Sequence, residues 1–211
     1  MENTAFKIAT SIASTLEESV LKKGYATLVV SGGNSPVEIF AHLNLMLISW
    51  SKVTIILGDD RMLDSANSDS NDKLIRENLI INKAGAAKYL SLIDPLVTPS
   101  NLNFPFDVSL LGMGLDGHFA SLFPELLPNM SLFEVDAPHE IYLSENALGD
   151  PSYKRITMNL SMLLDSVRCI LLVSSKSKRE VLDQAIGDSR LPIYHLINQN
   201  KVKIEFSDVD F

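Results

Sequence analysis

Cysteine and positive charge are scarce in this chain of 211 residues. The single cysteine, Cys169, excludes an intrachain disulfide, and its apolar neighbours indicate core packing rather than an activated thiol. Lys and Arg number 18 against 26 Asp and Glu, which gives a net charge of −8. Because nucleic acid and anionic membranes would be repelled over most of such a surface, neither is expected as a partner. A small anionic substrate remains possible, since it needs only a local cluster of cations and backbone amides.

Long apolar runs are also absent. No segment approaches the roughly 20 consecutive apolar residues that span a bilayer. The N-terminus carries Glu2 and no uninterrupted apolar stretch, so a secretory signal is not expected there. We therefore expect a soluble, cytoplasmic protein. With 46% hydrophobic and 21% charged residues, the composition is that of a globular protein, and the length suits one domain over 1–211.

Apolar periodicity divides the chain into alternating helices and strands. Helices are expected over 4–23, 36–45, 72–80, 177–186 and 192–197. Strands are expected over 25–30, 53–57, 108–111, 155–158, 168–173 and 201–206. The segment 58–71 is polar, and 83–105 is expected to be irregular. Strands separated by helical patterns indicate an α/β fold with a mainly parallel sheet and helices on both faces.

The first segment with chemical character is Ser31 to Pro36, which reads SGGNSP after a buried strand. Its two glycines let the backbone approach a ligand closely, because no Cβ intervenes. Ser35 and Glu38 have the capping-box spacing, and Pro36 suits the first helical position. The N–H groups of such a helix start favour an anion, especially phosphate, although a tight turn without a ligand is the alternative. The pattern of the nucleotide P-loop is absent.

The segment from Gly112 to Pro124 reads GMGLDGHFASLFP and contains Gly-x-Gly-x-x-Gly after a strand. Asp136 follows at about the spacing of a dinucleotide fingerprint, so a dinucleotide-binding oxidoreductase is one alternative. Protection of the protein against heat by NAD(P) would favour it. Against it, Pro124 and Pro128 interrupt the long helix that this fold needs, because a proline in a helix interior costs about 3 kcal/mol.

His118 stands directly after these glycines and beside Asp116. This setting suits proton transfer, because the ordinary pKa of histidine, about 6.5, lies near neutral pH. A histidine that only satisfies loop carbonyls is the structural alternative. The Gly-x-Ser-x-Gly elbow and zinc-ligand spacings are missing, so a water molecule activated by His118 is the remaining choice for hydrolysis.

A third segment gathers Lys176, Lys178 and Arg179 at the start of an expected helix. The helix macrodipole disfavours each cation there by about 0.3–1 kcal/mol, which makes sense if an anion binds beside them. The alternative is a solvated basic turn, for which salt screening makes the penalty small.

Taken in order, these segments resemble the 6-phosphogluconolactonase family, within the wider glucosamine-phosphate isomerase/deaminase-like superfamily. The matching elements are Ser31–Pro36, Gly58–Arg61 with Asp69–Asn71, Leu111–Pro124 against LGMGxDGHTASLFP, Arg155–Thr157, and Lys178. The resemblance implies a mixed three-layer α/β sandwich with a Rossmann-like sheet. It also implies hydrolysis of 6-phospho-D-glucono-1,5-lactone in the pentose phosphate pathway, without metal or nucleotide cofactor.

The resemblance assigns roles to particular residues. His118 becomes the general base, oriented by Asp116. Arg155, Arg61 and Lys178 become candidates for phosphate charge or for the developing oxyanion. The phosphate-binding backbone and hydroxyl donors become Gly32, Gly33, Asn34 and Ser35. A monomer or weak homodimer acting on a small sugar-phosphate lactone is expected.

Three departures from the family pattern stand near these motifs: Asp60 replaces a glutamate, Phe119 a threonine and Ser175 a glycine. The nearest rival enzyme is a glucosamine-6-phosphate deaminase-like isomerase, whose related signature ends in a catalytic glutamate before proline. Phe123 occupies that position here and cannot transfer a proton. A non-catalytic sugar-phosphate-binding protein with the same pocket is the alternative from a different class.

Overall fold

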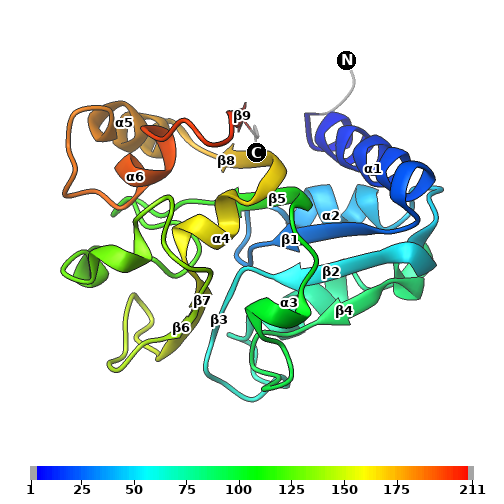
Figure 1. The fold of residues 1–211 in the computed structure, drawn as a ribbon, viewed down its shortest axis with the longest axis horizontal. Coiled ribbons are helices and arrows are strands. Elements are labelled where there is room, and N and C mark those ends of the chain that lie inside the picture. Colours follow the sequence, from blue (N-terminus) through cyan, green and yellow to red (C-terminus); the bar gives the residue numbers. More distant parts are fainter. Residues whose placement is uncertain (1–3, 209–211) are drawn as a thin grey trace.

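A parallel six-stranded sheet forms the centre of the computed structural model, which describes residues 4–208 (Figure 1). Every neighbouring pair in the order β4-β2-β1-β5-β8-β9 is parallel. The strands are β1 (Ala26–Val30), β2 (Val53–Leu57), β4 (Lys88–Leu90), β5 (Phe106–Gly112), β8 (Ser166–Val173) and β9 (Ile204–Asp208). Glu2, on which the N-terminal expectation rests, lies outside the described residues.

A second, antiparallel sheet in the order β3-β7-β6 adjoins the first. Its strands are β3 (Asp59–Arg61), β6 (Ile141–Leu143) and β7 (Arg155–Met158). Only Gly58 separates β2 from β3, and its backbone serves both sheets: its N–H donates to Val30 (2.9 Å) and its carbonyl accepts from Met158 (2.9 Å). The pairing of β3 with β7 places Arg61 opposite Arg155. Two cationic side chains are thereby brought together beside the carboxyl end of β2.

Helices cover the central sheet. They are α1 (Thr4–Lys23), α2 (Val37–Leu43), α3 (Asn71–Asn78), α4 (Leu160–Leu164), α5 (Lys176–Ala185) and α6 (Ile193–Ile197). Short 3-10 turns are η1 (Trp50–Lys52), η2 (Asn82–Ala86), η3 (Pro99–Asn101), η4 (Pro124–Leu126) and η5 (Met130–Leu132). Helix α1 packs on β1, β5 and α2 through a stripe that includes Ile8, Ile12 and Leu16. Within residues 4–208, no helix combines the length and apolarity that a bilayer crossing requires.

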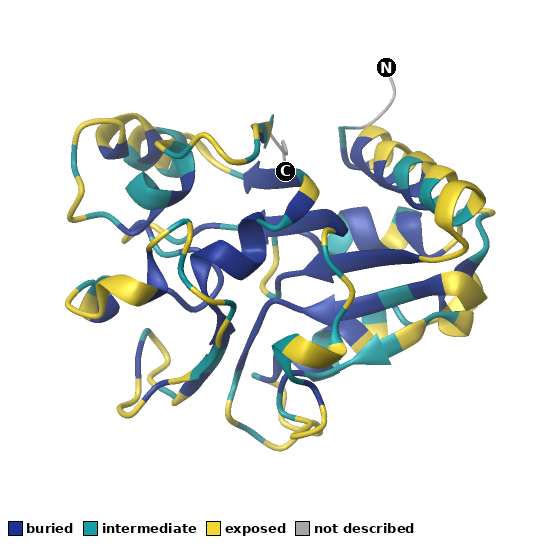
Figure 2. Ribbon diagram, viewed as in Figure 1, coloured by how far each residue is buried: buried dark blue, intermediate teal, exposed yellow. Residues whose placement is uncertain are grey.

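The buried core follows the strands (Figure 2). Every residue of β1 is buried, as expected for a strand with helices on both sides. Cys169 lies fully buried in β8, and burial raises the pKa of its thiol to about 12. The expectation of a packed rather than an activated cysteine is thus confirmed.

The α/β fold class and most of the expected elements are confirmed, and the helix at 4–23 and the strand at 53–57 have the expected bounds. The prediction of an irregular 83–105 is wrong, because it contains η2, η3 and the edge strand β4. Strand β3 in the polar segment, β6 and α4 were not predicted, since segments of three to five residues carry too little periodicity. The last strand begins at Ile204, three residues later than expected.

Candidate active site

Four of the motif segments follow strands of the parallel sheet and converge at its carboxyl edge. Residues 31–36 follow β1, 58–61 follow β2, 113–118 follow β5, and 174–178 follow β8. Ligands of open α/β sheets bind at this edge, outside the carboxyl ends of the strands. The topology therefore brings together residues that lie far apart in the sequence.

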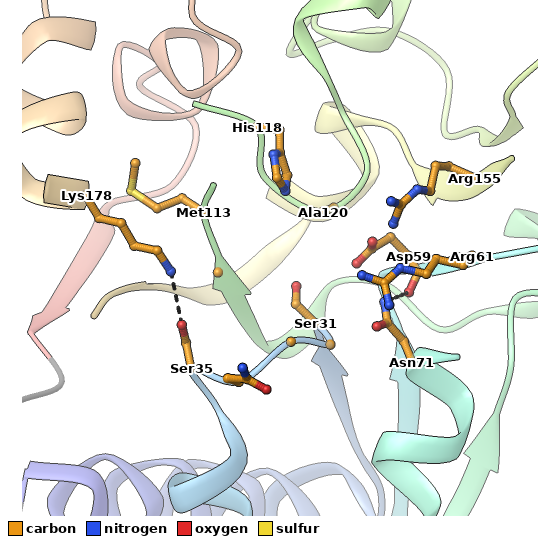
Figure 3. Close-up of a pocket in the computed structure, with 14 residues that line it drawn as sticks. Ser31, Ser35, Asp59, Arg61, Asn71, Met113, His118, Ala120, Arg155 and Lys178 are labelled. Carbon is orange, nitrogen blue, oxygen red and sulfur yellow. Dashed lines mark hydrogen bonds between the residues drawn. The ribbon is translucent and has the colours of Figure 1, made fainter. Parts of the chain in front are cut away.

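A cavity of about 170 Å³ opens where these segments meet (Figure 3). It is lined by Ser31, Gly32, Gly33, Asn34, Ser35, Asp59, Arg61, Asn71, Gly112, Met113, His118, Ala120, Arg155 and Lys178. Of the residues to which the family resemblance assigns roles, Asp116 alone is outside this lining. Asp116 lines an adjoining cavity of about 470 Å³, which shares His118, Arg61 and Arg155 with the first. The catalytic candidate and the SGGNSP loop thus face one cavity.

The His118 ring is held by a short loop after β5. The Gly114 N–H donates to the His118 carbonyl (2.8 Å), and the Gly117 N–H donates to the Gly114 carbonyl (3.2 Å). Gly117 has a positive φ of 77°, which glycine tolerates best. Asp116 Oδ1 lies 2.5 Å from His118 Nδ1 and also accepts from the His118 backbone N–H (3.2 Å). With Nδ1 engaged, Nε2 is the ring nitrogen left for a ligand.

The Asp116 carboxylate carries a charge suited to this contact. Partial burial acts to raise the pKa of Asp116, but the hydrogen bond and charge of His118 outweigh it, so the pKa lies below its ordinary value. The ionised carboxylate favours a proton on Nδ1 and stabilises the imidazolium once Nε2 takes up a second proton. The structure thus places Asp116 against His118, and the orienting role of Asp116 stays a prediction.

Phe123 packs against the other side of the site. Its ring stacks on His118 with centroids 4.2 Å apart and an interplanar angle of 29°. The Arg155 guanidinium lies 5.1 Å from the same ring centroid. The side chain that replaces the glutamate of the deaminase signature thus supports two residues of the site.

Gly114→Ala is expected to lower kcat/KM roughly 100-fold, because misplacing a catalytic group by about 1 Å has effects of this size. An added Cβ would lie 2.2 Å from His118 Cε1 and 2.5 Å from Asp116 Oδ1, so the pair must shift. The matched control is Gly187→Ala, whose Cβ would meet nothing within 4 Å. Steady-state kinetics of the hydrolysis that the family resemblance implies, together with thermal unfolding of both variants, check the prediction. Unchanged activity of Gly114→Ala would show that the placement of the ring is unimportant.

Lys178 marks a cationic wall of the cavity. Its Nζ donates to Ser174 Oγ (2.9 Å) and Ser35 Oγ (3.2 Å), and these two hydroxyls lie 2.9 Å apart. Within residues 4–208 this ammonium donates to these two hydroxyls and pairs with no carboxylate. Burial lowers the pKa of Lys178, as expected for a cation without a counter-ion. An anionic ligand would supply the missing charge.

The start of α2 differs from the expected capping box. The helix begins at Val37 with Pro36 as its N-cap, one residue later than predicted. The Ser35 hydroxyl is instead directed to Lys178 and Ser174 across the cavity. This Ser35 contact links the loop after β1 to the segment after β8.

Ser31 is a site residue that the sequence argument did not nominate. Its side chain is buried and lines the cavity, and in the described chain its Oγ has no hydrogen-bond partner. A buried hydroxyl without a partner is unfavourable unless a ligand or water completes it. The signal was present in the sequence, because Ser31 opens the SGGNSP motif.

The two arginines are fixed by backbone carbonyls. Arg155 donates from Nε to Leu148 (3.2 Å) and from Nη2 to Pro151 (3.1 Å), and Arg61 donates from Nη1 to Asp69 (2.6 Å). Burial lowers the pKa of Arg155, and the charge of Arg61 lowers it further. These contacts orient the guanidinium groups while leaving other donors toward the cavity.

Asp59 and Asn71 are further lining residues that the sequence argument missed. Asn71 donates from Nδ2 to the Asp59 carbonyl (3.1 Å), and its amide packs directly on Gly32. A Cβ at Gly32 would lie only 2.0 Å from Asn71 Oδ1, which explains the glycine there. Asp59 lies in the Gly58–Arg61 element and Asn71 in the Asp69–Asn71 element. Both elements match the family pattern, but the pattern alone assigned no role to either side chain.

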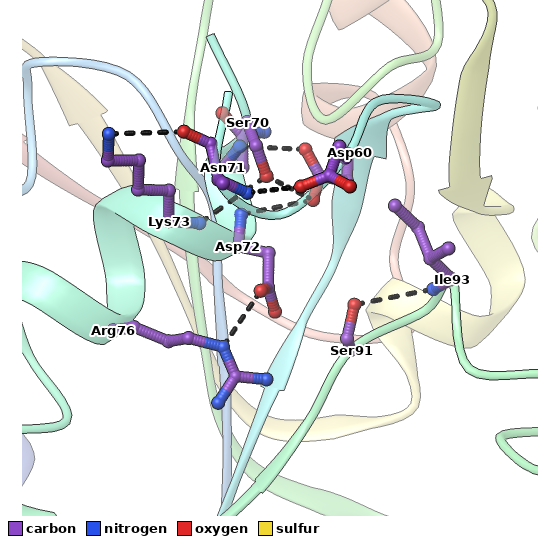
Figure 4. Close-up of polar contacts among 10 residues, drawn as sticks. Asp60, Ser70, Asn71, Asp72, Lys73, Arg76, Ser91 and Ile93 are labelled. Carbon is purple, nitrogen blue, oxygen red and sulfur yellow. Dashed lines mark hydrogen bonds and ion pairs between the residues drawn. The ribbon is translucent and has the colours of Figure 1, made fainter. Parts of the chain in front are cut away.

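Asp60 ties α3 to β3 (Figure 4). Its carboxylate accepts backbone N–H groups from Asn71 (2.7 Å), Asp72 (3.0 Å) and Arg61 (2.7 Å). Ser70 caps the same helix, accepting from the Lys73 N–H (3.3 Å). Asp60 is thus a fully buried anchor for the segment that carries Asn71.

The stability of the protein is expected to depend on Asp60 between about pH 4 and 6. Burial raises the pKa of Asp60 from 3.8 to about 6, and its three backbone donors only partly oppose this. Because the folded state holds this proton more tightly than the unfolded state, the contribution of Asp60 to the free energy of unfolding falls as pH rises through this interval.

Asp60→Asn removes this titration. Between pH 4 and 7, the free energy of unfolding of wild type should therefore fall by on the order of 2–3 kcal/mol relative to that of the variant. Urea unfolding of both proteins across that range measures the difference. Parallel stability curves would contradict the prediction.

The other two departures lie outside the cavity lining. Phe119 is fully buried in the core, and Ser175 is the N-cap of α5, where it accepts from the Lys178 N–H (3.2 Å). Among residues 4–208, no group of three or more His, Cys, Asp or Glu side chains is arranged to hold a metal ion.

Comparison with known proteins agrees with this geometry. The family model described as glucosamine-6-phosphate isomerases/6-phosphogluconolactonase matches residues 1–204. A 6-phosphogluconolactonase of Neisseria meningitidis serogroup A is 32% identical over 94% of this chain and 91% of its own length. One of Mesorhizobium japonicum is 34% identical over 90% and 84%.

Solved structures show the same likeness. A crystal structure of a 6-phosphogluconolactonase from Shewanella baltica has a TM-score of 0.86 at 32% identity, covering 99% of this chain and 93% of that one. A monomeric glucosamine-6-phosphate deaminase has a TM-score of 0.71 at 19% identity over 97% of this chain and 92% of its own, which shows a shared fold. The resemblance inferred from the motifs is confirmed, and this chain belongs to the glucosamine-6-phosphate isomerase/6-phosphogluconolactonase family.

Proposed function

We propose that this protein hydrolyses 6-phospho-D-glucono-1,5-lactone to 6-phosphogluconate, a step of the pentose phosphate pathway, with His118 activating the attacking water. One observation carries the proposal: the His118–Asp116 pair and the Ser31–Ser35 loop with Lys178 surround the same cavity. The relatives that are named 6-phosphogluconolactonase support the choice of substrate.

In this mechanism Asp116 keeps a proton on His118 Nδ1, so Nε2 accepts a proton from water while the water oxygen attacks the lactone carbonyl carbon. The tetrahedral intermediate carries its negative charge on the former carbonyl oxygen. Collapse of the intermediate breaks the bond to the ring oxygen, which receives the proton from His118 and becomes a hydroxyl group. General base catalysis of this kind contributes about 10²–10⁴-fold to a rate.

The three cations of the cavity differ in their surroundings, and this suggests a division of roles. Within the described residues the Lys178 ammonium donates to hydroxyls and to no carboxylate, and it lies beside the SGGNSP loop, so its charge is available to the phosphate. Arg61 and Arg155 interact with the carboxylates Asp59 and Asp60, which offset their charge. We therefore assign the phosphate to the Lys178 end and the developing oxyanion to the guanidinium groups.

The rival activities differ in what the site must supply. A deaminase of the related type uses a glutamate where Phe123 stands, and Phe123 packs on His118 instead. A sugar-phosphate-binding protein without turnover would need the same phosphate loop but no activated water. We also infer a cytoplasmic monomer or weak homodimer without nucleic-acid partners, in keeping with the net charge of −8.

A coupled assay tests the function. The lactone is generated from glucose 6-phosphate, and formation of 6-phosphogluconate is followed after subtraction of spontaneous hydrolysis. We expect a clear rate above background and no ammonia release from glucosamine 6-phosphate. A rate equal to background, with 6-phosphogluconate still bound, would favour the non-catalytic alternative.

A further inference from the structure

Asp59 is a carboxylate in the wall of a cavity that is otherwise suited to an anion, and the mechanism above gives it no step. Its side chain is buried and lines the cavity (Figure 3). Asp59, Arg61 and Arg155 lie together in this view, with Lys178 on the other side of the cavity. A buried charge at a binding site calls for a specific partner, because burying it without one is unfavourable.

One oxygen of the Asp59 carboxylate is already occupied. Ser121, which is fully buried, donates from Oγ to Asp59 Oδ2 (2.6 Å). In the described chain the other oxygen, Oδ1, has no hydrogen-bond partner, and it is not among the polar atoms sealed from solvent. The Ser121 contact thus occupies Oδ2 and leaves Oδ1 available to a ligand.

The charges around Asp59 favour the ionised form of its carboxyl group against the effect of burial. Burial raises the pKa of Asp59 above its ordinary value, and the Ser121 hydrogen bond and the charges of His118, Arg155 and Arg61 oppose this shift only in part. A carboxylate repels the phosphate of the substrate, so the phosphate belongs at the opposite, Lys178 end. What remains to face Asp59 is the hydroxylated ring.

We propose that Asp59 is a specificity-determining residue, whose Oδ1 accepts a hydrogen bond from one ring hydroxyl of the lactone. The proposal rests on the proposed function, because it places the lactone between Lys178 and Asp59. Carboxylate oxygens accept strong hydrogen bonds from hydroxyl groups, and the three ring hydroxyls at C2, C3 and C4 are the donors that such a substrate offers. A substrate without the bonded hydroxyl leaves a buried carboxylate unpaired, which is the strongest basis for rejecting an analogue.

The test compares 6-phosphogluconolactone with its 2-deoxy, 3-deoxy and 4-deoxy analogues. In wild type, kcat/KM for one of the three analogues should fall about 10- to 100-fold below that of the parent lactone, the range of a hydrogen bond to a charged group. In Asp59→Asn, the preference for that hydroxyl should fall to about threefold or less, since a charge-assisted bond is lost. The ratios for the other two analogues should stay as in wild type.

Ser121→Ala is the matched control, because it removes the hydrogen bond at Oδ2 and keeps the carboxylate. It should retain the hydroxyl preference even where its stability is lower. If Asp59→Asn does not fold, Asp59→Glu takes its place, and moving the carboxylate by one methylene should likewise reduce the preference.

Three results would overturn the proposal: no preference for any hydroxyl in wild type, equal preferences in wild type and the Asp59 variant, or an equal loss in Ser121→Ala. Absence of lactonase activity in wild type would instead refute the proposed function, so the two failures are distinguishable.

Discussion

His118→Ala is expected to lower kcat/KM for hydrolysis of 6-phosphogluconolactone by about 10²–10⁴-fold, the usual contribution of a positioned general base. The variant should remain folded, because the ring is partly exposed and its contacts are those with Asp116 and Phe123. Initial rates at several enzyme concentrations, corrected for spontaneous hydrolysis, give the ratio. Circular dichroism and thermal unfolding of both proteins establish that they are equally folded.

Asp116→Asn is the companion variant, since it keeps the shape of the side chain and removes the charge next to His118 Nδ1. We expect an intermediate loss of activity, because the ring can still be oriented but its proton uptake is less favoured. Equal rates of wild type and His118→Ala above background would remove His118 from the mechanism.

Lys178→Met should raise the KM for the phosphorylated lactone about 10- to 100-fold, as expected for losing a hydrogen bond between charged groups. Methionine keeps most of the apolar stem and removes the ammonium that contacts Ser35 and Ser174. With glucono-1,5-lactone, which has no phosphate, the same variant should differ little from wild type. The comparison of the two lactones therefore isolates the interaction with phosphate.

Lys176→Met is the matched control on the same helix, because its side chain is 92% exposed and pairs only weakly with Glu180. Its kinetics should equal those of wild type with both lactones. If Lys178→Met affected both lactones to the same extent, the ammonium would not be a phosphate ligand.

The local parts of the site could be predicted from the sequence because their geometry depends on near neighbours. His118 and Asp116 are two residues apart in a glycine-bounded loop, so their contact needs no information about the rest of the fold. The SGGNSP loop likewise lies where a buried strand ends, and the strand at 25–30 was evident from its apolar run.

The remaining parts depend on pairing between distant segments. Asp59 enters the cavity because β3 pairs with β7 immediately after the turn at Gly58, and a strand of three residues leaves no detectable pattern. The hydrogen bond from Lys178 to Ser35 joins segments that are 143 residues apart. Neither the capping-box spacing nor the helix pattern could indicate that Ser35 faces the cavity rather than its own helix.

The combined use of two sheets explains how the charges are arranged. The parallel sheet presents the SGGNSP loop, the His118 loop and Lys178 at one edge, and the antiparallel sheet adds Asp59, Arg61 and Arg155. The change of sheet occurs at Gly58, whose added Cβ would lie 3.2 Å from Val29 Cγ1. A larger residue there would strain the junction that brings the second set of charges to the cavity.

The most direct measurement is a crystal structure of this protein with 6-phosphogluconate bound. The phosphate should lie within hydrogen-bond distance of Lys178 Nζ and the backbone amides of 31–35, with the C1 carboxylate next to His118 Nε2. A product molecule bound outside this cavity, or with its phosphate at Asp59 and its carboxylate remote from the imidazole, would contradict the assignment of both ends of the site.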